Sequence, residues 1–115
     1  MPCRPRMSKV DIQDLRNWIG RRETREDVIT PAPVAALSAA LDHDKSRAAG
    51  GEPLPPGWHW LYFLDAVPAS ALDVDGHAKR GGFMPPVPLP RRKWAGSRLR
   101  FHAPLTVGDE ARRVT

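Results

Sequence analysis

The sequence predicts an α+β fold, because one segment has helix chemistry and three short segments have strand chemistry. Residues 31–42 (PAPVAALSAALD) are rich in alanine and leucine, the best helix formers. Residues 58–63, 98–102 and 110–115 instead carry bulky or alternating side chains that suit strands. At 115 residues the chain has room for one domain at most. Three short strands make a poor sheet, so we expect these residues to be the front part of a longer fold.

The N-terminal residues predict a short leader followed by an amphipathic helix. Residues 1–7 are expected to be disordered, and residues 8–115 to form the domain. Ser8 and Asp11 fit the S-x-x-[DE] pattern of a helix start, in which side chains satisfy free backbone N–H groups. One apolar stripe follows at helical spacing, formed by Ile12, Leu15 and Ile19. We therefore predict a helix over 9–19, ending at Gly20.

The second helix has the clearest local signals. The charged run RRETRED (21–27) is interpreted as a solvated connector that precedes it. Thr30 and Pro31 form a good helix entry, with a hydroxyl cap followed by proline in the first turn. The apolar face of the helix over 31–42 would consist of Val34, Leu37 and Leu41. The residues from 43 to 57 are then a loop by composition.

Strand chemistry begins at WHWLYF (58–63). In a strand, Trp58, Trp60 and Tyr62 would face one side, with His59, Leu61 and Phe63 on the other. Residues 66–90 are rich in turn formers, while 98–102 alternate as Arg-Leu-Arg-Phe-His. Residues 107–109 predict a turn, after which EARRVT looks like the start of another strand with no visible partner after it.

Charge and cysteine content narrow the class of protein. The net charge is +5, and the segment 76–108 holds seven Lys or Arg and no Asp or Glu, which points to a local anionic partner. Cys3 is the sole cysteine, so no internal disulfide exists. No apolar run approaches the roughly 20 residues of a membrane span, and the N-terminus lacks a signal-peptide core. We expect a cytoplasmic protein without a membrane partner.

The basic stretch PLPRRKWAG (88–96) permits several interpretations. Cations beside an aromatic are the ingredients of nucleic-acid binding, although no groove-binding helix or metal spacing accompanies them. Pro85 and Pro88 form a PxxP pair, but the flanking cation is badly placed for proline-rich docking. A solvated loop is a further possibility. Arg and Lys around a tryptophan can also clamp a phosphorylated ligand. Composition alone does not choose among these.

The remaining reactive residues indicate no catalytic centre. His43, His59, His77 and His102 lie far apart in sequence, without a second metal ligand at suitable spacing. His59, between two tryptophans, is expected to be at least partly buried, as a hydrogen-bonded core residue or as a catalytic base. Neither Cys3 nor any serine has a nucleophile context.

Several blocks together resemble one family. They are LRNWIGRRE, DVITPAPVAALSAALD, GEPLPPGWHWLYF and DGHAKRGGFMPPVPLPRRKWAGSRLRFHAPLTVGD, which cover about residues 15–112. They are similar to the N-terminal half of MaoC-like dehydratases and hydratases, in particular mesaconyl- and itaconyl-CoA hydratases and type 2 hydroxyacyl-thioester dehydratases. The PPGWHW and PLPRR-x-WAG blocks are the most specific.

The resemblance implies a double hot-dog fold, in which a long helix, here 31–42, is wrapped by an antiparallel sheet. Two such units pair side by side, and an acyl-CoA or acyl-carrier thioester binds between the units. Water is added to or removed from the α,β-carbons, with a histidine as general acid or base and a carboxylate beside it. No cofactor is implied beyond the CoA-thioester substrate, and the full-length form is expected to dimerise.

The family's catalytic motif is absent at the matching positions. Where it has Asp, Asn-Pro and His at the start of the long helix, this chain has Val28, Thr30 and Pro33. The resemblance thus implies that a C-terminal or separate hot-dog half carries the catalytic residues. This chain would contribute substrate-binding residues, namely Arg91, Arg92, Trp94, Gly96, His59 and Trp60, with the arginines suited to CoA phosphates. The alternatives are a small basic module binding nucleic acid or an acidic partner, and a truncated remnant without function.

Overall fold

The chain forms two compact units, each described here by itself. The computed structural model describes residues 10–44 and 47–115. The first unit comprises the described residues up to Arg22 together with Val67–Ser97, and the second comprises Glu23–Ala66 with Arg98–Thr115. The expected leader over 1–7 and the proposed cap at Ser8 lie outside the described residues.

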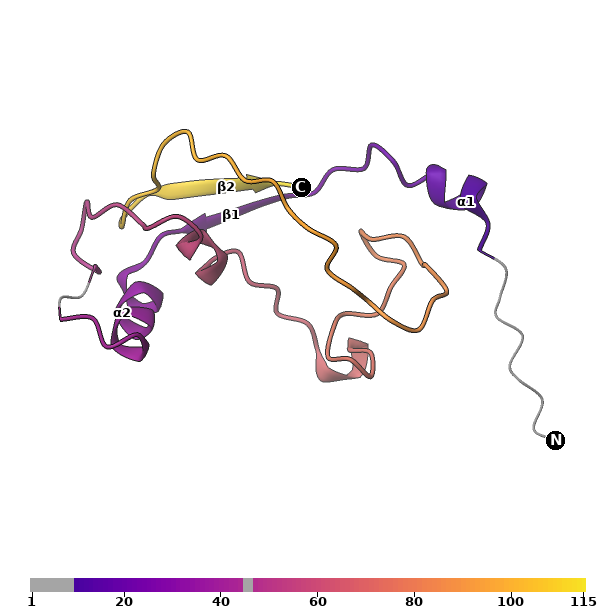
Figure 1. The fold of residues 1–115 in the computed structure, drawn as a ribbon, viewed down its shortest axis with the longest axis horizontal. Helices are drawn as coiled ribbons and strands as arrows, with labels where there is room; N and C mark the ends of the chain where they lie inside the picture. Colours follow the sequence, from indigo (N-terminus) through magenta and orange to yellow (C-terminus); the bar gives the residue numbers. More distant parts are fainter. Residues whose placement is uncertain (1–9, 45–46) are drawn as a thin grey trace. The chain divides into compact units, whose positions relative to one another are not determined.

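Few residues have regular structure (Figure 1). In chain order the elements are α1 (Ile12–Arg16), β1 (Thr24–Val28), α2 (Pro31–Ala40), the 3₁₀ turns η1 (Trp58–Leu61) and η2 (Ala69–Ala71), and β2 (Glu110–Val114). The α+β class is confirmed, and the sheet of the described residues has two strands.

The sheet contains one strand that the sequence did not predict, β1, and one that it did predict, β2. Strand β1 begins within the run interpreted as a solvated connector and extends one residue beyond it, and it pairs antiparallel with β2 from Thr24↔Val114 to Val28↔Glu110. Figure 1 shows the two strands side by side, although they come from opposite ends of the chain. The prediction of a strand at EARRVT is confirmed, and its partner precedes it in the sequence.

Charged side chains line most of this sheet, while Ala111 of β2 packs against the core. Arg112 pairs with Glu26 directly across the strands at 3.1 Å. Arg25 stands opposite Arg113, a like-charge pair that would be unfavourable alone. Arg25 is compensated by Glu23 and by Asp65, whose Oδ1 lies 2.7 Å from its Nη1. Because these ion pairs do not require alternating apolar residues, the hydrophobic pattern of the sequence does not indicate a strand at β1.

Helix α2 forms where it was predicted and ends two residues early. Proline occupies its first turn, but the Thr30 side chain makes no capping hydrogen bond, contrary to the predicted hydroxyl cap. Asp42 adopts a left-handed conformation with φ of 56°, and the N–H of His43 donates to the Ser38 carbonyl at 2.9 Å. This is the 6→1 bond of a Schellman ending.

The core of the second unit is small. Five apolar side chains are buried: Ile29, Val34, Leu54, Tyr62 and Val107. On α2 the buried positions are Val34 and Ser38, whereas Leu41, placed on the predicted apolar face, is 53% exposed. The Tyr62 hydroxyl donates to the Thr30 carbonyl at 2.6 Å and so ties the segment after η1 to the start of α2.

The predicted strand at 58–63 is wrong. Gly57 has a left-handed φ of 91°, which turns the chain so that Trp58–Leu61 wind into a single 3₁₀ turn against α2. The chain leaves this turn at Phe63, which also has a positive φ of 57°. The expected two-faced alternation of Trp58, Trp60 and Tyr62 therefore does not occur.

The predicted strand at 98–102 is also not formed among the described residues. Residues 91–101 contain neither helix, strand nor turn, and every residue from 91 to 104 is exposed. The turn predicted at 107–109 is confirmed, with Gly108 at φ of 102° and the N–H of Asp109 donating to Thr106. The turn-rich character of 66–90 is likewise confirmed.

The predicted helix at 9–19 is much shorter than expected. Asp11 caps α1 by accepting a hydrogen bond from the N–H of Gln13 at 2.9 Å. From Asn17 onward the N–H groups bond three residues back instead of four, up to Ile19. The last member of the predicted apolar stripe, Ile19, is 79% exposed. A helix of this length with so little burial has no packing to extend it.

Candidate functional site

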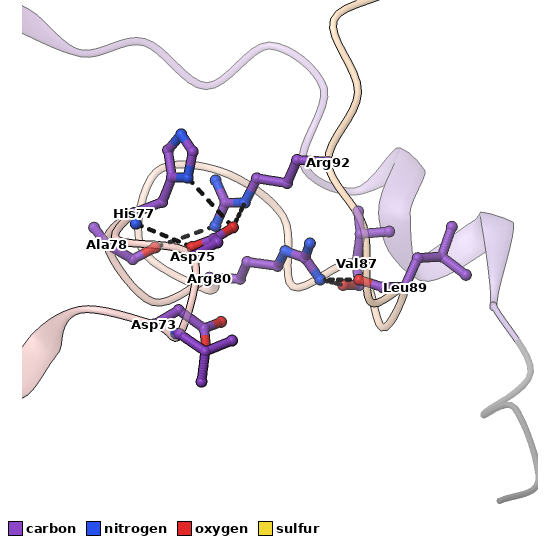
Figure 2. Close-up of polar contacts among 9 residues, drawn as sticks. Asp73, Asp75, His77, Ala78, Arg80, Val87, Leu89 and Arg92 are labelled. Carbon is purple, nitrogen blue, oxygen red and sulfur yellow. Dashed lines mark hydrogen bonds and ion pairs between the residues drawn. The ribbon is translucent and has the colours of Figure 1, made fainter.

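The basic stretch of the first unit is partly used to hold its own loop together (Figure 2). The Arg92 guanidinium lies 3.2 Å from an Asp75 carboxylate oxygen and also donates to the Ala78 carbonyl at 3.2 Å. Arg80 donates to the carbonyls of Val87 and Leu89. These cations thus close turns in a segment that has almost no regular structure.

Asp75 is the acidic centre of this loop. Its carboxylate accepts the backbone N–H of His77 at 3.0 Å, and it also faces the His77 ring and Arg92. The backbone hydrogen bond from His77, followed by the electrostatic interactions with the His77 ring and Arg92, lowers the pKa of Asp75. This His–carboxylate pair is exposed, two residues apart in one loop, and was not foreseen from the sequence.

The other predicted residues of the basic stretch have no such role. Arg91 and Lys93 make no ion pair with any residue that the structure describes. Trp94 is 77% exposed, and a Cβ placed on Gly96 would meet no atom within 4 Å. Arg91 and Trp94 are therefore open to solvent, whereas Arg92 is occupied by Asp75.

His59 and Trp60 belong to the second unit, whereas Arg91, Arg92, Trp94 and Gly96 belong to the first. His59 is partly buried, as expected, with its ring centroid 5.4 Å from that of Trp60 and 6.1 Å from that of Phe101. Trp60 is 62% exposed.

A pocket of about 640 Å³ opens beside His59 within the second unit. Its floor is mostly apolar and its polar groups are His59, Arg100 and His102. The full lining is Leu54, Pro55, Pro56, His59, Arg100, Phe101, His102, Ala103, Pro104 and Leu105. Of the substrate-binding residues predicted from the sequence, His59 lines this pocket. The alternation of charged and apolar residues over 98–102 was the sequence feature that could have indicated the wall of the pocket opposite His59.

The start of α2 carries no histidine or carboxylate at the three positions that match the catalytic motif described above. Val28, Thr30 and Pro33 stand there, and the neighbouring Asp27 carboxylate is occupied by backbone N–H groups. One oxygen accepts from Val28 at 2.8 Å and the other from Phe63 at 2.9 Å. Burial, with a smaller contribution from Asp27, raises the pKa of the Tyr62 phenol, which therefore stays a hydrogen-bond donor.

Over residues 10–44 and 47–115 no group of three His, Cys, Asp or Glu side chains gathers to hold a metal ion. In those residues, too, no helix has the length and apolar character to cross a bilayer.

Comparison with known proteins defines the class. The family model described as hydroxyacyl-thioester dehydratase type 2 matches residues 57–115, about half of the chain. The chain therefore belongs to the hydroxyacyl-thioester dehydratase type 2 family, and the resemblance seen in the sequence is confirmed.

Two curated relatives match this chain over most of its length. The chain is 51% identical over 100 residues to mesaconyl-C(4)-CoA hydratase of Chloroflexus aurantiacus, a match covering 87% of this chain and 36% of the relative. It is 34% identical over 87 residues to the mitochondrial hydroxyacyl-thioester dehydratase type 2 of Schizosaccharomyces pombe, covering 70% of this chain and 29% of that protein. The chain thus spans about a third of the length of these relatives.

Proposed function

We propose that this chain is the N-terminal, non-catalytic part of an acyl-thioester hydratase or dehydratase. In this proposal it forms one incomplete hot-dog unit over residues 8–115 and supplies scaffold and part of the pocket wall. A second part carries the histidine and carboxylate that add water to, or remove it from, the α,β-carbons of an acyl-CoA or acyl-carrier thioester. The full-length assembly is a dimer.

The observation that carries the proposal is the start of α2. The polar groups near it are already committed: Asp27 accepts two backbone N–H groups, and the Tyr62 hydroxyl donates to the Thr30 carbonyl. Valine and proline side chains cannot transfer protons, and Thr30 is far too weak an acid or base to replace a histidine. Chemistry at this helix start therefore needs groups from elsewhere.

The proposed contact with substrate uses the cations that the loop leaves free. Arg91 is exposed and makes no ion pair with a described residue, and Trp94 beside it is 77% exposed. A guanidinium can bind phosphate oxygens in two-point contacts, and an indole can cover a flat ring. Arg92 is assigned a supporting role, because its guanidinium is already bound to Asp75 and Ala78.

A chimera tests this function. The segment of the Chloroflexus mesaconyl-C(4)-CoA hydratase that matches this chain is replaced by the chain, and hydration of mesaconyl-C(4)-CoA is followed by loss of enoyl absorbance. We expect an active chimera and no activity from the chain alone. A folded but inactive chimera, or hydration by the chain alone, would contradict the proposal.

Paired variants of the active chimera separate the roles of the two arginines. Arg91→Ala is expected to raise KM about tenfold with little change in kcat, as for the loss of a charge-assisted contact of roughly 1.5 kcal/mol. Arg92→Ala is expected to make the loop 73–92 susceptible to proteolysis. Arg91→Ala should leave the rate of proteolysis unchanged. Unchanged kinetics in both variants would remove the basic stretch from the substrate pocket.

A further inference from the structure

Residues 98–103 (RLRFHA) form a stretch of unpaired backbone in the second unit. No backbone N–H or C=O of these six residues makes a hydrogen bond to any other described residue. Pairing resumes at Leu105, whose carbonyl accepts the N–H of Leu54 at 2.7 Å. A row of free donors and acceptors is a template for another strand.

The pocket of the second unit lies directly along this stretch. Residues 100–105 form one wall, and Leu54, Pro55, Pro56 and His59 form the other. The two prolines have no N–H, so that part of the opposite wall cannot donate to an incoming backbone. An extended peptide entering the pocket would therefore find free backbone partners along Arg100–Ala103.

The side chains of this stretch alternate in chemistry. Arg98, Arg100 and His102 share one parity, while Leu99 and Phe101 share the other. Leu99 and Phe101 are 54% and 52% exposed, large fractions for apolar groups. Neither arginine makes an ion pair with a described residue, and the segment 76–108 has no acidic residue to provide one.

We infer that residues 98–103 bind a second, extended strand in which acidic and apolar residues alternate. The strand would add edge-to-edge, with its carboxylates beside Arg98 and Arg100 and its apolar side chains beside Leu99 and Phe101. Its source would be the polypeptide part that completes the fold, so the inference rests on the proposed function and specifies where and by what chemistry that part attaches.

A second copy of this stretch is a poor occupant. In antiparallel self-pairing, residues directly opposite each other share one face of the sheet. A register that pairs residues of equal parity places arginine opposite arginine or histidine. A register that pairs unequal parity places arginine opposite leucine or phenylalanine. Neither register gives Arg98 or Arg100 a carboxylate across the strands, which favours an acidic partner over self-association.

Peptide binding to the ¹⁵N-labelled chain tests the inference. The probes are an alternating Glu-Val octapeptide, the matching Lys-Val octapeptide, and the Glu-Val peptide N-methylated at alternate residues. We expect the Glu-Val peptide to shift and protect the amides of residues 99–103. The Lys-Val peptide and the N-methylated peptide should bind at least about tenfold more weakly, since they lose the charge pairs and the backbone pairs respectively.

Charge reversal supplies the matched control. The double variant R98E/R100E should lose about tenfold in affinity for Glu-Val and gain affinity for Lys-Val. The variant R91E/K93E makes the same change in net charge outside the stretch and should bind Glu-Val as the unaltered chain does. All four positions are exposed, so folding is not expected to change, and circular dichroism of each variant checks this.

Three results would overturn the inference. They are equal loss of binding in the two double variants, equal binding of the N-methylated peptide, and tighter binding of a single-stranded oligonucleotide than of Glu-Val at the same salt concentration. The chimera assay reports separately on the proposed function. An active chimera without peptide binding removes only the strand site, whereas peptide binding with an inactive chimera removes only the proposed reaction.

Discussion

Truncation of Ile29 should reveal how much of the second unit depends on its five-residue core. Ile29 is fully buried between β1 and α2, and its N–H and C=O are bonded to Asp109 and Gly108. Ile29→Ala leaves those backbone bonds in place and removes three buried carbon atoms. At about 0.8 kcal/mol per buried methylene, the transfer part alone is about 2.4 kcal/mol. With the remaining cavity we expect a loss of about 3 kcal/mol in the free energy of unfolding.

That loss is large for a unit of this size. The second unit has about 60 residues, for which about 0.05–0.15 kcal/mol per residue gives a total of about 3–9 kcal/mol. Urea titration followed by tryptophan fluorescence measures the change, with Ile29→Val expected near 1 kcal/mol. Ile19→Ala is the control, because Ile19 is 79% exposed. If Ile29→Ala and Ile19→Ala differ by less than about 0.5 kcal/mol, the assignment of the core is wrong.

Three further substitutions probe single features of the same unit. Ser38 is 2% exposed and its hydroxyl has no hydrogen-bond partner among the described residues, so Ser38→Ala should stabilise the chain by about 1 kcal/mol in urea titration, unlike Ser70→Ala at an exposed site. Gly108→Ala should cost about 1–3 kcal/mol through its φ of 102° alone, because an added Cβ meets no atom within 4 Å; equal stability would refute this. Hydrogen bonds from Thr106 lower the pKa of Asp109, so its stabilisation is present above the unfolded pKa near 4 and is lost as the pH falls through the lower folded pKa. Asp109→Asn should flatten the acid limb of the stability curve, and an unchanged limb would contradict this.

Local chemistry was enough to predict some elements of this fold. Helix α2 follows from a proline in the first turn and a run of alanines, and the turn at 107–109 follows from its glycine. Both depend on residues close in sequence. The helix boundary was missed by two residues because Asp42, unlike glycine, gives little warning of a left-handed ending.

The missed elements depend on distant partners or on a single backbone angle. Strand β1 is highly charged, and it is a strand because its backbone pairs with the distant β2, with ion pairs to Arg112 and Asp65 beside it. The segment 58–63 has strand chemistry, yet Gly57 turns it into a 3₁₀ turn. For the site, the sequence correctly indicated partial burial of His59, but the pocket wall formed by Phe101 and its neighbours required the return of the chain after Pro104.

The long separation of β1 and β2 affects how this unit can fold. The Glu26–Arg112 pair joins residues 86 positions apart, so the loop must close before the sheet gains any pairing energy. Contacts of such high sequence separation slow folding. During synthesis, β1 leaves the ribosome long before β2 exists, and α2 can form in that interval without its sheet. The nascent chain is consequently exposed to chaperones and proteases at least until β2 emerges.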